Sequence, residues 1–170
     1  ANGHPDKWGG ETFFQDREYY SFLEAGWTPR FKDRNDKNLR LTYWHQDARI
    51  KAGVPEGWGL SFSAAWKFKN RLAPFLRGGY AHGGVIPARS AVVAGIGYHR
   101  RSHDLVGAAL GWSEPWESGL RNQVTLETFY RIQLSQNIGI TPDLQMIWNP
   151  SRNPGESWIG VLGFRFQIVL

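Results

Sequence analysis

Apolar and polar side chains alternate along most of the chain, and an apolar period of 3.6 residues is almost absent. In the segment 123–134, the even positions carry mainly apolar residues, whereas the odd positions carry Gln, Thr, Glu, Phe, Arg and Gln. The run 158–170 repeats this pattern, with Phe164 and Phe166 on either side of Arg165. Because successive side chains of a strand point to opposite faces, the alternation predicts β-strands with one apolar and one polar face.

The same pattern predicts nine strands separated by turns. They cover residues 19–28, 39–46, 58–68, 72–81, 90–100, 104–113, 121–134, 138–149 and 157–170. Several approach the roughly nine to eleven residues that a tilted strand needs to cross a bilayer. Short connections at 69–71, 101–103 and 135–137 alternate with longer, Gly- and Pro-rich ones at 47–57, 82–89, 114–120 and 150–156. Short turns at one end and long loops at the other are typical of an all-β, antiparallel up-and-down transmembrane β-barrel.

The aromatic residues of the apolar faces support two membrane-interface belts. Trp27, Trp66, Phe68 and Tyr98 fall beside short turns, and Tyr80, Trp112, Trp148 and Trp158 fall beside long loops. A soluble β-sandwich or a lipocalin-like barrel would show similar alternation, and its aromatics would fill a core. The charges on the polar face require water, because burying so many in a dry core is too costly. That wet face is the outside of a soluble fold or the lumen of a membrane barrel.

Composition narrows the class further. The 170 residues, 41% hydrophobic and 21% charged, fit one folded unit, and no window approaches the roughly 18 apolar residues of a spanning helix. The absence of Cys excludes a disulfide framework, a thiol nucleophile and Cys-ligated metal. The net charge of +5 suits anionic partners or an ordinary basic surface. Nucleic acid is not expected, because Lys and Arg are spread through every strand.

The sequence carries no enzyme motif: a metalloprotease HExxH, a Walker loop, a nucleophile elbow and GxGxxG are all missing. His99 and His103 have the spacing of a helical metal site, but they flank a basic turn, so neither a metal nor another cofactor is expected. A lipid-modifying barrel enzyme is the alternative from another class. Such an enzyme would need Ser90 or Ser113 beside a histidine such as His82. These residues have the types found in a catalytic triad, but none lies in a catalytic sequence motif.

Several stretches are similar to one known family. They are Leu41–Arg49, Gly53–Gly59, Pro74–Tyr80, Asp104–Trp112, Glu127–Leu134 and Ile140–Gln145, followed by Asn149-Pro150 and Asn153-Pro154. In these motifs and their order, the chain resembles the C-terminal half of the carbohydrate-selective outer-membrane porins of the OprB type, over about residues 17 to 170. Leu170 departs from the terminal Phe common in such barrels, although its apolar spacing with Phe166 and Ile168 still fits an insertion signal.

The resemblance implies a sixteen-stranded barrel in the bacterial outer membrane that passes sugars by passive diffusion. Only about nine strands are readable here, and an isolated nine-stranded sheet would leave two edges unpaired in lipid. We therefore expect residues 17–170 to be a segment of a larger barrel, completed by the rest of a longer protein or by a second chain or copy. Residues 1–16 are expected to form a loop or a partial strand. Closure of a smaller barrel with the help of residues 11–16 is the other possibility.

The expected function is a non-enzymatic porin for small solutes, most of all sugars, in contact with outer-membrane lipids and lipopolysaccharide. A non-channel outer-membrane barrel, structural or lipid-modifying, is the alternative. The alternation places ten candidate solute-binding residues toward the lumen: Arg77, Arg131, Glu127, Glu24, Arg40, Trp44, Lys67, Asp143, Gln145 and Arg165. Phe75 and Phe129 are also expected to point inward, and Leu126 and Phe164 to face lipid.

Overall fold

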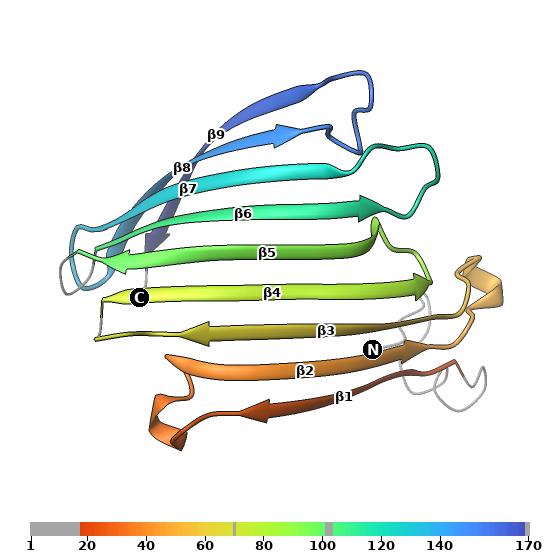
Figure 1. Ribbon diagram of the computed structural model, residues 1–170, viewed down its shortest axis with the longest axis horizontal. Coiled ribbons are helices and arrows are strands. Elements are labelled where there is room, and N and C mark those ends of the chain that lie inside the picture. Colours follow the sequence, from red (N-terminus) through yellow and green to blue (C-terminus); the bar gives the residue numbers. More distant parts are fainter. Residues whose placement is uncertain (1–17, 70, 101–103, 169–170) are drawn as a thin grey trace.

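A computed structural model describes residues 18–69, 71–100 and 104–168 of the chain. Nine strands and two short 3-10 helices make up its regular structure (Figure 1). The elements are β1 (Tyr20–Trp27), η1 (Phe31–Asp33), β2 (Lys37–Gln46), η2 (Ile50–Ala52), β3 (Gly57–Trp66), β4 (Leu72–Gly83), β5 (Ala88–His99), β6 (Leu105–Pro115), β7 (Gln123–Gln133), β8 (Ile138–Trp148) and β9 (Trp158–Ile168). The expectations for residues 1–16 and for Leu170 lie outside the described residues. None of the helices found in the described part has the length or apolar character needed to cross a membrane.

The strands form one sheet in chain order, β1 to β9, and every neighbouring pair is antiparallel. All nine predicted strands are confirmed, and their described ends agree with the predicted ends within two residues. The two helical turns η1 and η2 were not predicted from the sequence. The sheet is not closed: within the described residues, β1 pairs only with β2 and β9 only with β8.

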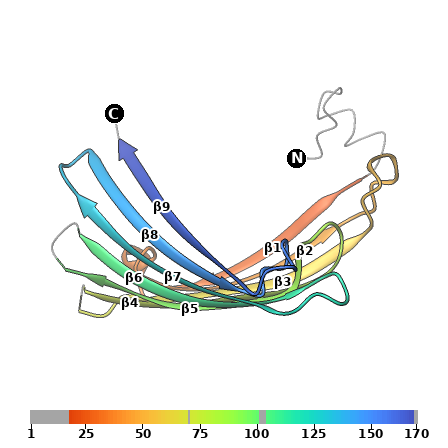
Figure 2. The same ribbon diagram turned by 90° about the horizontal axis from the view of Figure 1, so that it is seen from above.

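The sheet is strongly curved and leaves one side hollow (Figure 2). Along β5, Val92, Ala94 and Ile96 are exposed, whereas the intervening Val93 and Gly95 are partly covered. Side chains converge on the concave side of a curved sheet and shield one another, so the face of Val93 is the concave one. We call this side the inner face and the side of Val92 the outer face. The cross-strand register carries each face from strand to strand across the whole sheet.

The outer face is apolar and uncovered. Leu110 on β6 is 55% exposed and Leu162 on β9 is 68% exposed, and the described residues contain no buried apolar core. Leu126 lies on this face opposite Leu110, and Phe164 lies on it opposite Pro142. Both residues therefore have the orientation expected from the sequence. A water-soluble sheet would cover such a surface, so this face requires an apolar surrounding.

Aromatic side chains gather at both ends of the outer face. At the short-turn end, Trp27 and Trp66 stack with ring centroids 6.2 Å apart, and the Lys37 ammonium lies 5.5 Å from the Trp66 ring. At the long-loop end, Trp148 pairs with Trp158 across β8 and β9. Aromatic rings at the two ends of a lipid-facing barrel wall place their apolar parts in lipid and their polar edges among the headgroups. The arrangement agrees with two interface belts.

Aromatic rings on the inner face pack against glycines of the neighbouring strands. The Phe75 ring on β4 covers Gly95 on β5, and the Phe129 ring on β7 covers Gly107 on β6. A methyl group built on Gly95 would lie 2.5 Å from the Phe75 ring and 2.8 Å from the Ala108 carbonyl oxygen. Phe75 and Phe129 thus lie on the inner face, as expected. Covering strand glycines with a cross-strand ring also stabilises the sheet at these positions.

Gly95→Ala is expected to lower the free energy of unfolding by about 1–3 kcal/mol, because the added methyl group must displace the Phe75 ring and the backbone of β6. Gly160→Ala is the matched control, since the nearest atom to its methyl group, on the Trp158 ring, lies 3.6 Å away. Urea unfolding of the folded barrel measures both values. Equal stability of the two variants would contradict the packing described for Phe75.

Leu126→Lys is expected to cost about 2–4 kcal/mol, the penalty for a lysine in the middle of a lipid-facing barrel wall. Thr125→Lys changes the adjacent residue of β7, which lies on the wet inner face, and should cost much less. Unfolding in lipid vesicles compares the two variants. A cost at position 125 as large as that at 126 would show that the two faces have been assigned the wrong way round.

Candidate functional site

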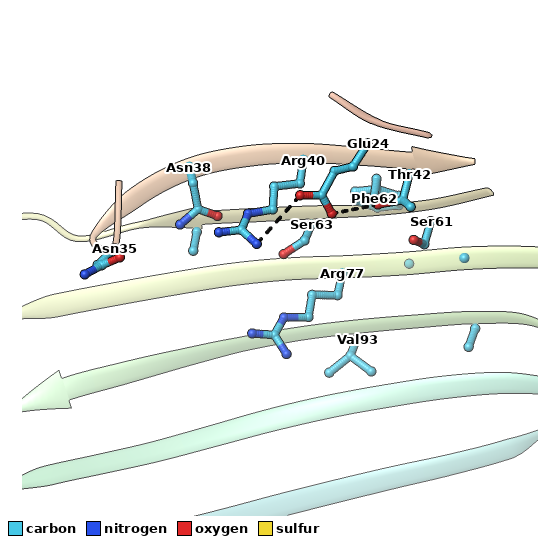
Figure 3. Close-up of a pocket in the computed structure, with 14 residues that line it drawn as sticks. Glu24, Asn35, Asn38, Arg40, Thr42, Ser61, Phe62, Ser63, Arg77 and Val93 are labelled. Atoms are coloured by element: carbon cyan, nitrogen blue, oxygen red, sulfur yellow. Dashed lines mark hydrogen bonds and ion pairs between the residues drawn. The ribbon is translucent and has the colours of Figure 1, made fainter. Parts of the chain in front are cut away.

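The inner face of the N-terminal half of the sheet encloses a hollow of about 660 Å³ (Figure 3). Its walls come from β1 to β5, and the side chains that matter for its chemistry are Glu24, Arg40, Thr42, Ser61, Ser63 and Arg77. Hydroxyl, carboxylate and guanidinium groups therefore line the same hollow. The hollow exists because the small residues of β3 lie between the longer side chains of β2 and β4, and small residues of β5 leave space on the other side of β4.

Arg40, Ser63 and Arg77 form a direct cross-strand row on β2, β3 and β4. Neighbouring strands lie about 4.7–4.9 Å apart, so the two arginine backbones are separated by about 10 Å along the sheet. Ser63 stands between them with a side chain too short to fill the gap. The row thus presents two guanidinium groups with a hydroxyl between them.

Glu24 interacts with β2 in two ways. The Thr42 hydroxyl donates a hydrogen bond of 3.1 Å to one carboxylate oxygen, and Arg40 Nη1 lies 3.9 Å from the other. The Arg40 and Glu24 side chains are 53% and 45% exposed, so water screens their attraction and the pair is weak. Both groups therefore keep donors and acceptors available for a solute.

Arg77 is held differently. Its guanidinium carbon lies 5.4 Å from the centre of the Phe75 ring, within the range of a cation–π contact. No ion pair of Arg77 is found among the described residues. Gly95 seats the Phe75 ring, and Phe75 in turn limits where the Arg77 guanidinium can lie.

The other predicted residues lie on the same inner face but outside this hollow. Glu127 is directly opposite Gln145 across β7 and β8, and Asp143 is opposite Phe129, with its carboxylate packed over Gly163. Trp44 covers Gly59 near the long-loop end and stacks on Tyr20 at 6.2 Å. Lys67 directly follows β3 at the short-turn end, where its ammonium lies 3.4 Å from Asp36.

Arg131 and Arg165 extend the basic character of this face toward the short-turn end. Arg131 is opposite Leu105 on β6, and Arg165 is opposite Thr141 on β8. The Nε atom of Arg131 is buried without a hydrogen-bond partner among the described residues. Arg131 falls in the stretch between Phe129 and Ile132 where the β7–β8 pairing is interrupted, and Pro142 of β8 has no backbone N–H to donate there.

The structure thus brings three of the ten predicted residues, Glu24, Arg40 and Arg77, into one hollow and spreads the others along the inner face. The sequence reasoning missed the small polar residues beside them, Thr42, Ser61 and Ser63. Their signal was present in the alternation of β3, where Ser61, Ser63 and Ala65 occupy successive inner positions. Short hydroxyl side chains at alternate positions leave room for a solute beside the sheet.

The serines considered for an enzyme face opposite sides of the sheet. Ser90 pairs with Tyr80 on the outer face, whereas Ser113 pairs with Ala91 on the inner face. The His82 ring lies between the rings of Trp58 and Trp116, with centroids at 6.1 and 5.7 Å. Packing between two tryptophans gives His82 a role in the aromatic belt rather than beside a nucleophile.

A curved antiparallel sheet with a charged, hollow inner face and an uncovered apolar outer face defines a piece of transmembrane β-barrel wall. The family model of the carbohydrate-selective porins, OprB family, matches residues 27–170. The chain belongs to this family, which confirms the resemblance noted in the sequence and places the chain in the bacterial outer membrane.

Two relatives are porins of chlamydial species. The chain is 30% identical over 157 residues to Porin AaxA of Chlamydia felis, and this match covers 86% of the chain and 34% of that porin. It is 28% identical over 160 residues to Porin AaxA of Chlamydia abortus, a match that covers 88% of the chain and 35% of that porin. The chain thus spans about a third of the length of these relatives. No solved structure matches the chain.

Proposed function

We propose that the nine strands form part of the wall of an outer-membrane pore through which small solutes, most of all sugars, diffuse passively. One observation carries this proposal: the charged and hydroxyl side chains of the strands gather on the concave side of the sheet, and the convex side is apolar and exposed. That division matches a water-filled lumen surrounded by lipid. The carbohydrate-selective description of the family supports sugars as the solutes.

The inner-face residues suit sugars by their chemistry. Arg40 and Glu24 supply donors and acceptors for vicinal hydroxyls, and Ser63 adds a short hydroxyl between the two arginines. The rings of Phe75 and Trp44 offer apolar faces for the C–H groups of a pyranose. Such contacts in water are individually weak, which lets a solute enter and leave without being trapped. No bond is made or broken in this process, so the proposed activity is not enzymatic.

We propose further that strands beyond these nine complete the barrel. The free sides of β1 and β9 would otherwise place unpaired N–H and C=O groups in the hydrocarbon region, where no water can pair with them. The additional strands come from the rest of a longer protein or from a second chain or copy. Outer-membrane lipids and lipopolysaccharide surround the outer face of this assembly.

The absence of native Cys makes a thiol-labelling test specific. The variant Ser63→Cys, in the hollow, should form a disulfide with a bulky water-soluble thiol reagent. This labelling should slow sugar-driven swelling of vesicles that contain the barrel. A reducing agent that removes the label should restore the rate. The control is Leu41→Cys on the outer face, where the thiol lies in lipid and should neither react nor affect swelling. Labelling at position 63 with unchanged sugar flux would contradict the pore.

The mass and strand content of the folded particle in detergent, with every chain identified, test how the barrel closes. A wide barrel with strands in addition to β1–β9 is expected, because both edges then find partners. A narrow monomer closed by this chain alone would contradict the proposed completion. It would instead support a non-channel barrel with a structural or lipid-modifying role.

A further inference from the structure

We propose that Arg77 gives the pore a preference for sugars that carry a carboxylate over neutral sugars of the same size. This inference rests on the proposed pore function and names the solute class for its hollow. The site consists of the Arg77 guanidinium, the Ser63 hydroxyl directly opposite it, and the Arg40–Glu24 pair on the far side of Ser63.

In the described part of the chain, Arg77 carries a positive charge without a nearby negative partner. Arg40 has a carboxylate partner in Glu24, whereas Arg77 has none among the described residues. The predicted acids Glu127 and Asp143 lie on β7 and β8, three and four strands away from β4. At about 4.7–4.9 Å per strand these distances along the sheet exceed the screening length of about 8 Å in physiological salt. The hollow therefore has an excess positive charge located at Arg77.

The Phe75 ring positions the Arg77 side chain before a solute arrives. Phe75 precedes it by two residues on the same face of β4, and the guanidinium lies over its ring at 5.4 Å. The ring cannot move into the sheet, because it already lies against Gly95. An arginine that packs on an aromatic ring by its face keeps its N–H donors at the edge free to bind a carboxylate through two parallel hydrogen bonds.

The remaining polar groups of the hollow are spaced to contact the ring hydroxyls of a sugar. Directly opposed residues of neighbouring antiparallel strands have Cβ atoms about 4.5–5.5 Å apart, so the Ser63 hydroxyl lies beside the space in front of Arg77. Arg40 and Glu24 follow on the next strands, beyond Ser63. A sugar acid whose carboxylate binds Arg77 can therefore direct its ring hydroxyls toward Ser63 and the Arg40–Glu24 pair.

The experiment compares the entry of glucuronate and of glucose into vesicles that contain the complete barrel. Arg77→Gln is expected to lower the glucuronate-to-glucose rate ratio by about two- to fivefold, the size of an interaction between partly exposed charges. The glucose rate of the unmodified protein establishes that the pore conducts sugar, and the strand content of each variant, measured by circular dichroism, shows that it has folded. Arg77→Lys should keep part of the preference, because it keeps the charge but loses the planar fork.

Two further variants separate binding at Arg77 from general charge and from general packing. Arg152→Gln removes the same charge from the β8–β9 connection, outside the hollow, and should leave the ratio unchanged. Phe75→Leu keeps every charge but removes the ring beneath the guanidinium, so it should lower the ratio as a loss of positioning. The preference of the unmodified protein should weaken with added salt, because screening of the Arg77 charge increases.

The outcomes distinguish this inference from the proposed function. An unchanged ratio in Arg77→Gln, or an equal fall in Arg152→Gln, would overturn the role of Arg77 while sugar diffusion remained established by the glucose rate. A pore that passes neither sugar would overturn the proposed function and this inference together. A lowered ratio in Arg77→Gln and Phe75→Leu alone would support the site as described.

Discussion

Within a membrane, each backbone N–H and C=O must find a partner inside the protein, and this constraint organises the whole chain. The antiparallel meander meets it for β2 to β8, which pair on both sides. Because the ladder fixes which residues lie opposite one another, it also separates apolar from polar side chains over nine strands. Within the described residues, β1 and β9 each pair on one side, and the proposed completion of the barrel would satisfy the same constraint at these two strands.

The separation of the two faces also determines how side chains on the inner face are held. Because they cannot pack into a buried core, rings and charged groups pack against residues of neighbouring strands. The rings of Phe75 and Phe129 pack on Gly95 and Gly107, and the Arg77 guanidinium packs on the Phe75 ring. Small residues in one strand thus determine how much space and which orientation the long side chains of the next strand receive. A pore wall can be ordered by such contacts without a buried interior.

Polar groups are unevenly distributed along the inner face. The hollow of β1–β5 combines hydroxyl groups with two arginines and a single glutamate, whereas Glu127, Gln145 and Asp143 occupy β7 and β8. This separation gives a diffusing solute different electrostatic surroundings on different parts of the wall. Membership of a carbohydrate-selective family agrees with a surface rich in hydrogen-bonding groups, and the proposed preference of Arg77 would act through this uneven distribution of charge.

The period of two in the sequence determined the strands and the face of each side chain, because these are local properties of an extended backbone. The alternation of short and long connections predicted their up-and-down order. The period of two placed Arg77 and Glu127 on one face and Leu126 on the other, as the strand register does, but it did not show which charges meet. Glu24, Arg40 and Arg77 share a hollow only through the register of four strands and the curvature of the sheet. A shift of one strand by two residues would keep every side chain on its face and still separate these groups. That choice rests on pairing between distant segments, which only the tertiary structure decides.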